Sequence, residues 1–217
     1  MNFKNIFLLI TSFFILGALN THANASTQEP IGNISIVIGD VEIQHTDSTE
    51  QKAEQKAPIY LGDVISTKND DSFVRVDFID GTNITMNGMD AELAIDEYIF
   101  DPAHLKANKA NFKILRGSFE FVGGLLDKGE SENVQIDLDF GSIGVRGTKV
   151  LRAMKDNECW IYLEEGEIRV FNGAGTRILK AGDGTRIKDK LISPTEVKPW
   201  SQKNIDWIKS EVALPVE

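Results

Sequence analysis

The octapeptide GSIGVRGT, residues 141–148, places three glycines at three-residue spacing around an alternating Ile and Val and one arginine, Arg146. Glycine adopts positive φ freely and lets a second backbone approach closely, so this density of glycine in a β-branched run predicts a bent strand. Apolar residues occupy even positions over residues 134–140 but odd positions within the octapeptide. Because side chains alternate along a strand, the switch requires a bulge or corner, which we place at Gly141 and Ser142.

Strand patterns flank the octapeptide on both sides. Over residues 73–78, Val and Phe alternate with Arg75 and Asp77, which is typical of a half-buried strand. The Asp80 and Gly81 pair that follows predicts a tight hairpin. Further strands are expected over 31–43, 112–122, 134–140, 159–163, 167–171, 176–179 and 185–187. Many short strands with glycine-bearing turns predict an all-β fold, a sandwich or a β-roll or jelly-roll-like domain.

Other segments lack a strand pattern. Residues 44–56 are polar throughout and predict an exposed loop, and the polar, alanine-rich stretch 102–110 leaves room for a short helical turn. Gly166 is expected to mark a turn between the strands that flank it. After Pro199, Ser201 is a suitable N-cap for a short C-terminal helix, which we expect to cover an open end of the β domain and protect a sheet edge.

The domain organisation follows from these patterns. Residues 1–25 carry one lysine, an apolar run and a small-x-small triplet, which predicts a cleaved signal peptide and a periplasmic protein. A β domain is expected over 26–198 and a helical tail over 199–217. No cysteine stands near the cleavage site to indicate a lipoprotein, and no later segment is apolar enough to span a membrane.

The net charge limits the binding partners to be expected, and the cysteine content indicates how the fold is stabilised. The net charge is −10, or about −11 without the signal peptide, so we expect no binding to nucleic acid or to anionic lipid. The single cysteine, Cys159, cannot form an internal disulfide and is expected to be a small buried side chain. Stability must therefore come from a hydrophobic core. The oligomeric state is left open.

We find no pattern that predicts catalysis, a cofactor or a metal. The histidines His22, His45 and His104 lie far apart, and no nucleophile has a recognisable context. The octapeptide matches neither nucleotide-binding fingerprint. Aspartates beside glycines are explained by turn formation and follow no calcium-binding repeat.

Arg146 and its neighbours form the first group of candidate residues. Its planar fork suits a carboxylate, and we favour an internal salt bridge to a turn aspartate over ligand binding. Loss of a buried pair would cost about 3–5 kcal/mol. The candidate structural or binding residues are Arg146, Gly144, Gly147, Thr148, Asp80 and Asp63.

Aromatic residues near the C-terminus form the second group. Trp160 and Tyr162 alternate outward from an apolar strand face, so they suit either a sugar-stacking platform or packing beneath the tail helix, which we favour. The candidate interaction residues are Trp160, Tyr162, Trp200 and Trp207.

Together these motifs resemble the FecR domain of exported bacterial proteins, in order and spacing, over about residues 58–150. The segments that carry the resemblance are LGDVIST at 61–67, VRVDF at 74–78, DGT at 80–82, LRG at 115–117 and GSIGVRGT at 141–148. That family is known from periplasmic parts of regulators that receive a signal from an outer-membrane transporter and control a sigma factor. Such regulators carry a cytoplasmic segment before a membrane helix, whereas here the apolar run begins at Ile6.

The resemblance implies a noncatalytic periplasmic β module whose use is protein contact. We therefore expect an interaction module of the bacterial envelope, with a role in signalling, that binds another envelope protein through sheet edges or the tail. The alternative is an envelope module that binds glycan or polysaccharide through the aromatic residues.

Overall fold

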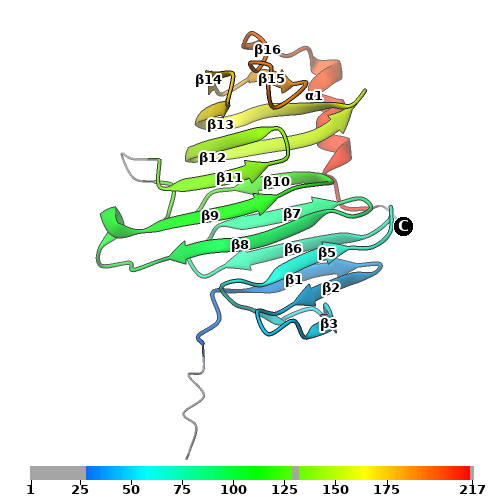
Figure 1. The fold of residues 1–217 in the computed structure, drawn as a ribbon, viewed down its shortest axis with the longest axis vertical. Helices are drawn as coiled ribbons and strands as arrows, with labels where there is room; N and C mark the ends of the chain where they lie inside the picture. The colour runs from blue at the N-terminus through cyan, green and yellow to red at the C-terminus, as the bar shows by residue number, and fades with distance from the viewer. Residues whose placement is uncertain (1–27, 129–131, 216–217) are drawn as a thin grey trace, which may run out of the picture.

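The computed structural model describes residues 28–128 and 132–215, so the predicted signal peptide, residues 1–25, lies outside the described residues. The described residues form one large curled sheet and one C-terminal helix (Figure 1), which confirms the all-β prediction. The strands of the first half are β1 (Gly32–Ile38), β2 (Val41–Gln44), β3 (Glu50–Lys52), β4 (Pro58–Ile59), β5 (Val64–Thr67), β6 (Phe73–Phe78), β7 (Asn83–Asn87) and β8 (Glu92–Ile99).

The second half continues the same sheet. A 3₁₀ turn, η1, precedes β9, within the stretch expected to hold a helical turn. The remaining elements are η1 (Leu105–Ala107), β9 (Lys109–Ile114), β10 (Ser118–Val122), β11 (Val134–Leu138), β12 (Gly141–Lys155), β13 (Glu158–Asn172), β14 (Gly175–Lys180), β15 (Asp183–Ile187), β16 (Lys198–Pro199) and α1 (Gln202–Glu211).

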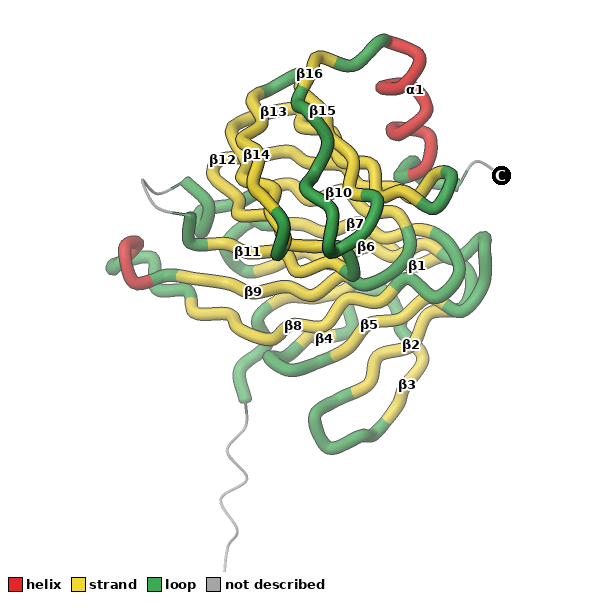
Figure 2. Tube along the Cα trace, turned by 45° about the horizontal axis from the view of Figure 1, so that its top comes forward, coloured by secondary structure: helices red, strands yellow, loops and turns green. Residues whose placement is uncertain are grey.

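The sheet folds over on itself at β12. The strand order is β3-β2-β5-β8-β9-β11-β12-β10-β7-β6-β1-β4, and all pairs in it are antiparallel except β9 with β11. The first half of β12 pairs with β11 and the second half with β10, so one strand serves both layers. Figure 2 shows the two layers facing each other beneath the β12–β13 hairpin.

The core fills the space between the layers. The ring centroids of Phe112 in β9 and Phe78 in β6 lie 5.1 Å apart, and Phe121 in β10 lies 6.2 Å from Phe112. These side chains bridge the two layers and are buried together with the inward Ile and Val residues of neighbouring strands. Cys159 is buried and free, as expected for a small apolar side chain.

The bend in β12 lies six residues beyond its predicted place. The Asp139–Phe140 pair is a two-residue hairpin connection, because Leu138 pairs with Gly141. The prediction of a corner at Gly141 and Ser142 is therefore wrong. The register of β12 against β13 instead shifts between Arg146 and Val150, around Gly147 with φ +64°.

Three other expectations are also wrong. Residues 50–52 of the predicted loop form β3, which pairs with β2. Gly166 lies inside the continuous strand β13, opposite the bulge of β12, and marks no turn between strands. The helix α1 covers an outer face of the sheet, where Ile208 packs on Leu151, and so does not protect an edge.

Candidate functional site

Two motifs from the sequence meet at a third segment that joins β10 to β11. The turn at Asp80 receives hydrogen bonds from this segment, in which Leu126 N donates to Asp80 Oδ2 at 3.1 Å. The bulge of β12 donates to the same segment, since Gly147 N donates to the Asp127 carbonyl at 2.7 Å. We call Asp80, Thr82, Asp127 and Thr148 the carboxylate hub. It ties three loops together at one end of the curled sheet.

Asp80 uses both of its carboxylate oxygens within the hub. Its side chain is buried, with Oδ1 accepting from Tyr98 OH at 2.8 Å and from Thr82 N at 3.2 Å. Oδ2 accepts from Thr82 Oγ1 at 2.7 Å, in addition to Leu126 N. Burial raises the pKa of the Tyr98 phenol, and its hydrogen bond to Asp80 raises it further. Asp80 therefore organises the hairpin turn and is fully engaged by the fold.

Asp127 faces the bulge from the other side. Its side chain is fully buried, and Oδ2 accepts from Thr148 N at 2.8 Å. Burial raises the pKa of the Asp127 carboxyl; the Thr148 N–H opposes this effect, and the negative charge of Asp80 adds to it. Asp127 Oδ1 and Thr148 Oγ1 have no hydrogen-bond partner among the described residues. Thr148 thus enters the hub through its backbone.

The glycines of the octapeptide shape the strand beside the hub. Gly147 supplies the positive φ of the bulge. Gly144 lies beneath Glu132, whose carboxylate occupies the space that a Cβ would need and accepts from Arg169 Nε at 2.8 Å. Both candidate glycines therefore have structural roles.

Arg146 lies on the surface. Its side chain is 49% exposed, and its Nη2 lies 3.4 Å from Glu167 Oε1 on the neighbouring strand β13. The prediction of an internal salt bridge to Asp80, Asp63 or another turn aspartate is wrong. Arg146 precedes the bulge and shares the outward face of Gly144, so it points away from the hub.

A small effect is therefore expected when Arg146 is changed. The Arg146→Ala protein should lose no more than about 0.5–1 kcal/mol of unfolding free energy, because exposed ion pairs contribute little. Urea denaturation of the variant and the wild type measures this difference. A loss of about 3 kcal/mol or more would instead indicate that the guanidinium is buried in solution.

Asp63 belongs to a separate group. Its carboxylate is buried, with Oδ1 2.8 Å from His45 Nδ1 and Oδ2 accepting from Tyr60 N at 2.9 Å. These residues line an open hollow of about 340 Å³ together with Gln28, Thr46 and Asp47. The fold does not bring Asp63 to the hub.

Two aliphatic side chains stand on the surface beside the hub. Ile79 is 58% exposed and Leu125 is 45% exposed. Leu125 N donates to the Asp80 carbonyl at 2.9 Å, and Ile79 directly precedes Asp80. The hub therefore fixes the two loops that carry these exposed side chains.

The four candidate aromatic residues form one cluster at the tail. Trp160 lies 5.2 Å from Trp200 and 5.4 Å from Trp207, between ring centroids, and Tyr162 stacks on Trp200 at 5.6 Å. The cluster packs with α1 against the outer face of β12 and β13, so the expectation of packing beneath the tail helix is confirmed. Tyr162 is 6% exposed, so its ring is not open to stack on a sugar, whereas Trp160 is partly buried.

Several residues of the site were missed from the sequence. In the sequence, Asp127 has the pattern of an ordinary turn residue. Tyr98 has the pattern of an ordinary strand residue. Arg152, rather than Arg146, is the fully buried arginine: it donates to the Gly117 carbonyl and lies 3.4 Å from Cys159 Sγ through Nε. Burial raises the pKa of the Cys159 thiol, and the nearby guanidinium opposes that effect.

Within residues 28–128 and 132–215, no group of three or more His, Cys, Asp or Glu side chains could hold a metal ion. Over the same residues, α1 and η1 are both too short and too polar to cross a membrane.

Comparison with known proteins finds solved structures with a similar fold. No family model matches the chain, and no curated protein matches it. A solved structure of a proposed anti-sigma factor from Parabacteroides distasonis is similar, with a TM-score of 0.51 and 14% identity over 67% of this chain and 65% of that chain. A second structure described in the same words has a TM-score of 0.49 and 14% identity, covering 66% and 63% of the two chains. The chain thus spans about 65% of the length of the first relative, and at this identity the similarity concerns the fold.

Proposed function

We propose that this chain is a noncatalytic FecR-like module of the bacterial periplasm that acts in signalling by contact with another envelope protein. The observation that carries the proposal is how the motif residues are used. Asp80 and the backbone of Gly147 and Thr148 bond to the fold itself, and Arg146 pairs with Glu167. These residues build a scaffold, and the fold similarity to a proposed anti-sigma factor is consistent with a regulatory use.

The surface that the scaffold supports suits a protein partner. Ile79 and Leu125 are exposed, and a buried hydrogen-bond network fixes the loops that carry them. Exposed apolar side chains on loops held by a rigid framework are common features of binding surfaces. We assign the partner contact to this end of the sheet.

Site-specific photocrosslinking tests the proposal. A photoreactive amino acid is placed at Leu125, and at Lys113 as a control on the exposed face of β9, in the full chain expressed in its native envelope. The Leu125 position should give a discrete protein adduct that Lys113 does not give. The isolated protein should begin at Ser26 and fractionate with the periplasm.

Two results would contradict the proposal. One is the absence of a protein adduct at Leu125, or the same set of adducts from Leu125 and Lys113. The other is a protein that retains residues 1–25 and fractionates with the cytoplasm.

A further inference from the structure

The strand β14 leaves one edge of the sheet open. Among the residues that the structure describes, β14 pairs with β13 alone, whereas the next strand, β15, pairs with β13 on one side and with β16 on the other. Thr195 also covers the edge of β15, because its Oγ1 accepts from Arg186 N at 2.9 Å. Figure 1 shows β14 beside β13 at the end of the molecule away from β3.

The hairpin register shows which backbone groups are free. Asn172 pairs with Gly175 across a two-residue connection, so Gly175, Arg177 and Leu179 direct their N–H and C=O groups to β13. The intervening residues Thr176 and Ile178 direct theirs away from it. The amide of Lys180 already donates to Asp183 Oδ2 at 3.0 Å. Two residues of β14 can therefore pair with an added strand.

Exposed aliphatic side chains border this edge. Ile178 is 49% exposed on the outer face of β14. Leu191 is 77% and Ile192 54% exposed in a loop that packs on the β13–β14 connection, where Ser193 Oγ donates to the Ala174 carbonyl at 2.6 Å. The edge thus offers apolar contact as well as backbone groups.

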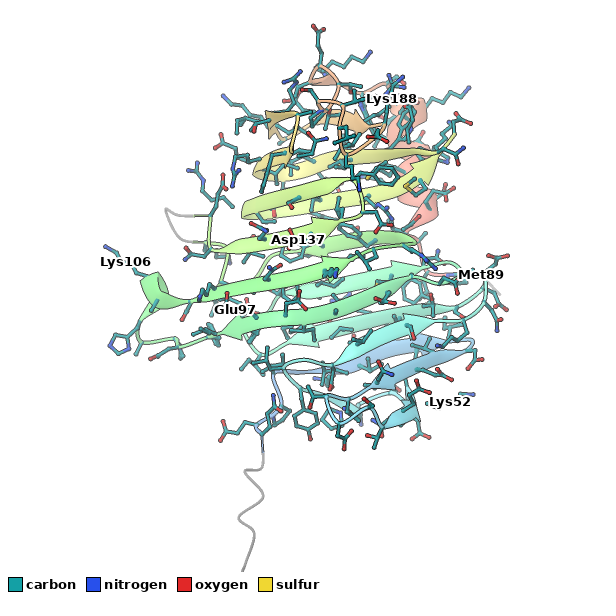
Figure 3. The ribbon with its side chains drawn as sticks, in the orientation of Figure 1. Lys52, Met89, Glu97, Lys106, Asp137 and Lys188 are labelled. Atoms are coloured by element: carbon teal, nitrogen blue, oxygen red, sulfur yellow. The ribbon has the colours of Figure 1, made fainter. Side chains whose placement is uncertain are left out.

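The charge of this region is opposite to that of the protein. Residues 175–199 hold six Lys and Arg side chains and three Asp and Glu side chains, whereas the whole chain has 23 and 33. Lys188 lies 3.0 Å from Glu158. Arg177, Lys180 and Lys190 have no ion-pair partner within the part of the chain that the structure describes. Figure 3 places Lys188 at the end of the molecule opposite to Lys52.

We propose that the open edge of β14 receives an extended acidic segment of a partner protein, which adds to the sheet as a further strand. An aliphatic side chain of that segment packs on Ile178, and the carboxylates on its other face lie on the side of the strand that carries Arg177. Lys180 and Lys190 add positive charge around this edge. This inference rests on the proposed function in taking a protein as the partner. Charge favours the acidic segment over a second copy, because an antiparallel twofold pairing centred on Ile178 joins two positively charged edges and makes the two Arg177 side chains diagonal neighbours on one face.

A peptide titration tests the proposal. The probe is a blocked, fluorescent eight-residue peptide in which Glu alternates with Val and Thr, and the comparison peptide carries Lys in place of Glu. Anisotropy is measured with the purified protein at low and high salt. Only the acidic peptide should bind, and more weakly at high salt. The Arg177→Gln, Lys180→Gln double variant should bind it more weakly and with less salt dependence.

Edge variants separate strand addition from simple charge attraction. Ile178→Pro removes an amide that has no partner in the sheet, so it should lower peptide affinity by about tenfold or more. Lys52→Pro is the matched control, since Glu42 and Lys52 form a non-hydrogen-bonded pair at the edge of β3, and it should bind as the wild type does. Ile178→Glu leaves the backbone amide intact and replaces the apolar side chain with a negative one, so it should also lower peptide affinity. It is the variant to use if the proline variant fails to fold.

Several outcomes would overturn the proposal: no binding of the acidic peptide, equal binding of both peptides, or unchanged affinity in both Ile178 variants. A concentration-dependent dimer that Ile178→Pro abolishes would assign the edge to a second copy instead. If the peptide fails to bind while the Leu125 crosslink persists, the edge proposal fails and the proposed function stands.

Discussion

The Asp80→Ala protein is expected to lose about 3–5 kcal/mol of unfolding free energy, because several buried donors lose their acceptor together. The Tyr98 hydroxyl, the Thr82 hydroxyl and the Leu126 amide all donate to this carboxylate. A buried donor left unpaired costs roughly 1–3 kcal/mol. The loss also frees the loop at Leu125, so the crosslink proposed above should weaken with it.

Urea denaturation measures this loss, and Asp77→Ala is the matched control. Asp77 lies three residues earlier, in β6, and pairs with Arg75 at 2.8 Å with both side chains about 40% exposed. Its removal should change the unfolding free energy by less than about 1 kcal/mol. Equal losses in the two variants would show that the hub does not stabilise the fold.

The carboxylate hub contains some features that local sequence motifs predict and others that they do not. The hairpin at Asp80 was predictable from its local pattern, since a tight turn depends on neighbouring residues. The local pattern also indicated a bend in the octapeptide but placed it at Gly141 and Ser142, six residues before the bulge. The partner Asp127 was not predictable, because its contacts join loops that are far apart in sequence. An aspartate in a glycine-containing turn has the same local sequence pattern whether it caps an exposed turn or anchors a buried one.

The expected positions of both arginines of β12 depended on where the strand bends. If the bend lay at Gly141, the alternation of side chains would continue unchanged to the end of the strand and would place Arg152 on the outward face. With the bulge at Gly147, odd positions face inward before it and even positions after it, so Arg146 is exposed and Arg152 is buried. The bulge was assigned to the wrong glycine because the hairpin turn at Asp139 and Phe140 carries no glycine of its own.

The tail was predicted with more success, because its pattern is local. Ile205, Ile208 and Val212 recur at helical spacing after Ser201, and all three pack on the sheet. The face of the sheet that these helix residues cover is set by β12. After the bulge its side chains at odd positions face outward, so Leu151 and Ala153 contact the helix. The apolar outer face therefore requires the helix, and the aromatic residues that suggested a sugar platform are part of that contact.

Gly166→Ala is expected to lower the unfolding free energy by about 3–4 kcal/mol. Gly166 has φ +88°, a conformation that costs an L-residue roughly 1–2 kcal/mol. A Cβ at this position would also overlap the backbone carbonyl of Gly147 on the neighbouring strand. Backbone cannot rotate away as a flexible side chain can, so the overlap adds about 1–3 kcal/mol by displacing the bulge.

Gly182→Ala separates the two contributions. Gly182 has φ +91°, and a Cβ there meets no heavy atom within 4 Å, so this variant carries the backbone cost alone, about 1–2 kcal/mol. The difference between the two variants measures how tightly the strands cross at the bulge. Because the bulge carries Thr148 and the amide that Asp127 accepts from, a displaced bulge also weakens the hub. The Gly166→Ala, Asp127→Ala double variant should then lose less than the two single losses combined, whereas strict additivity would show that bulge and hub are independent.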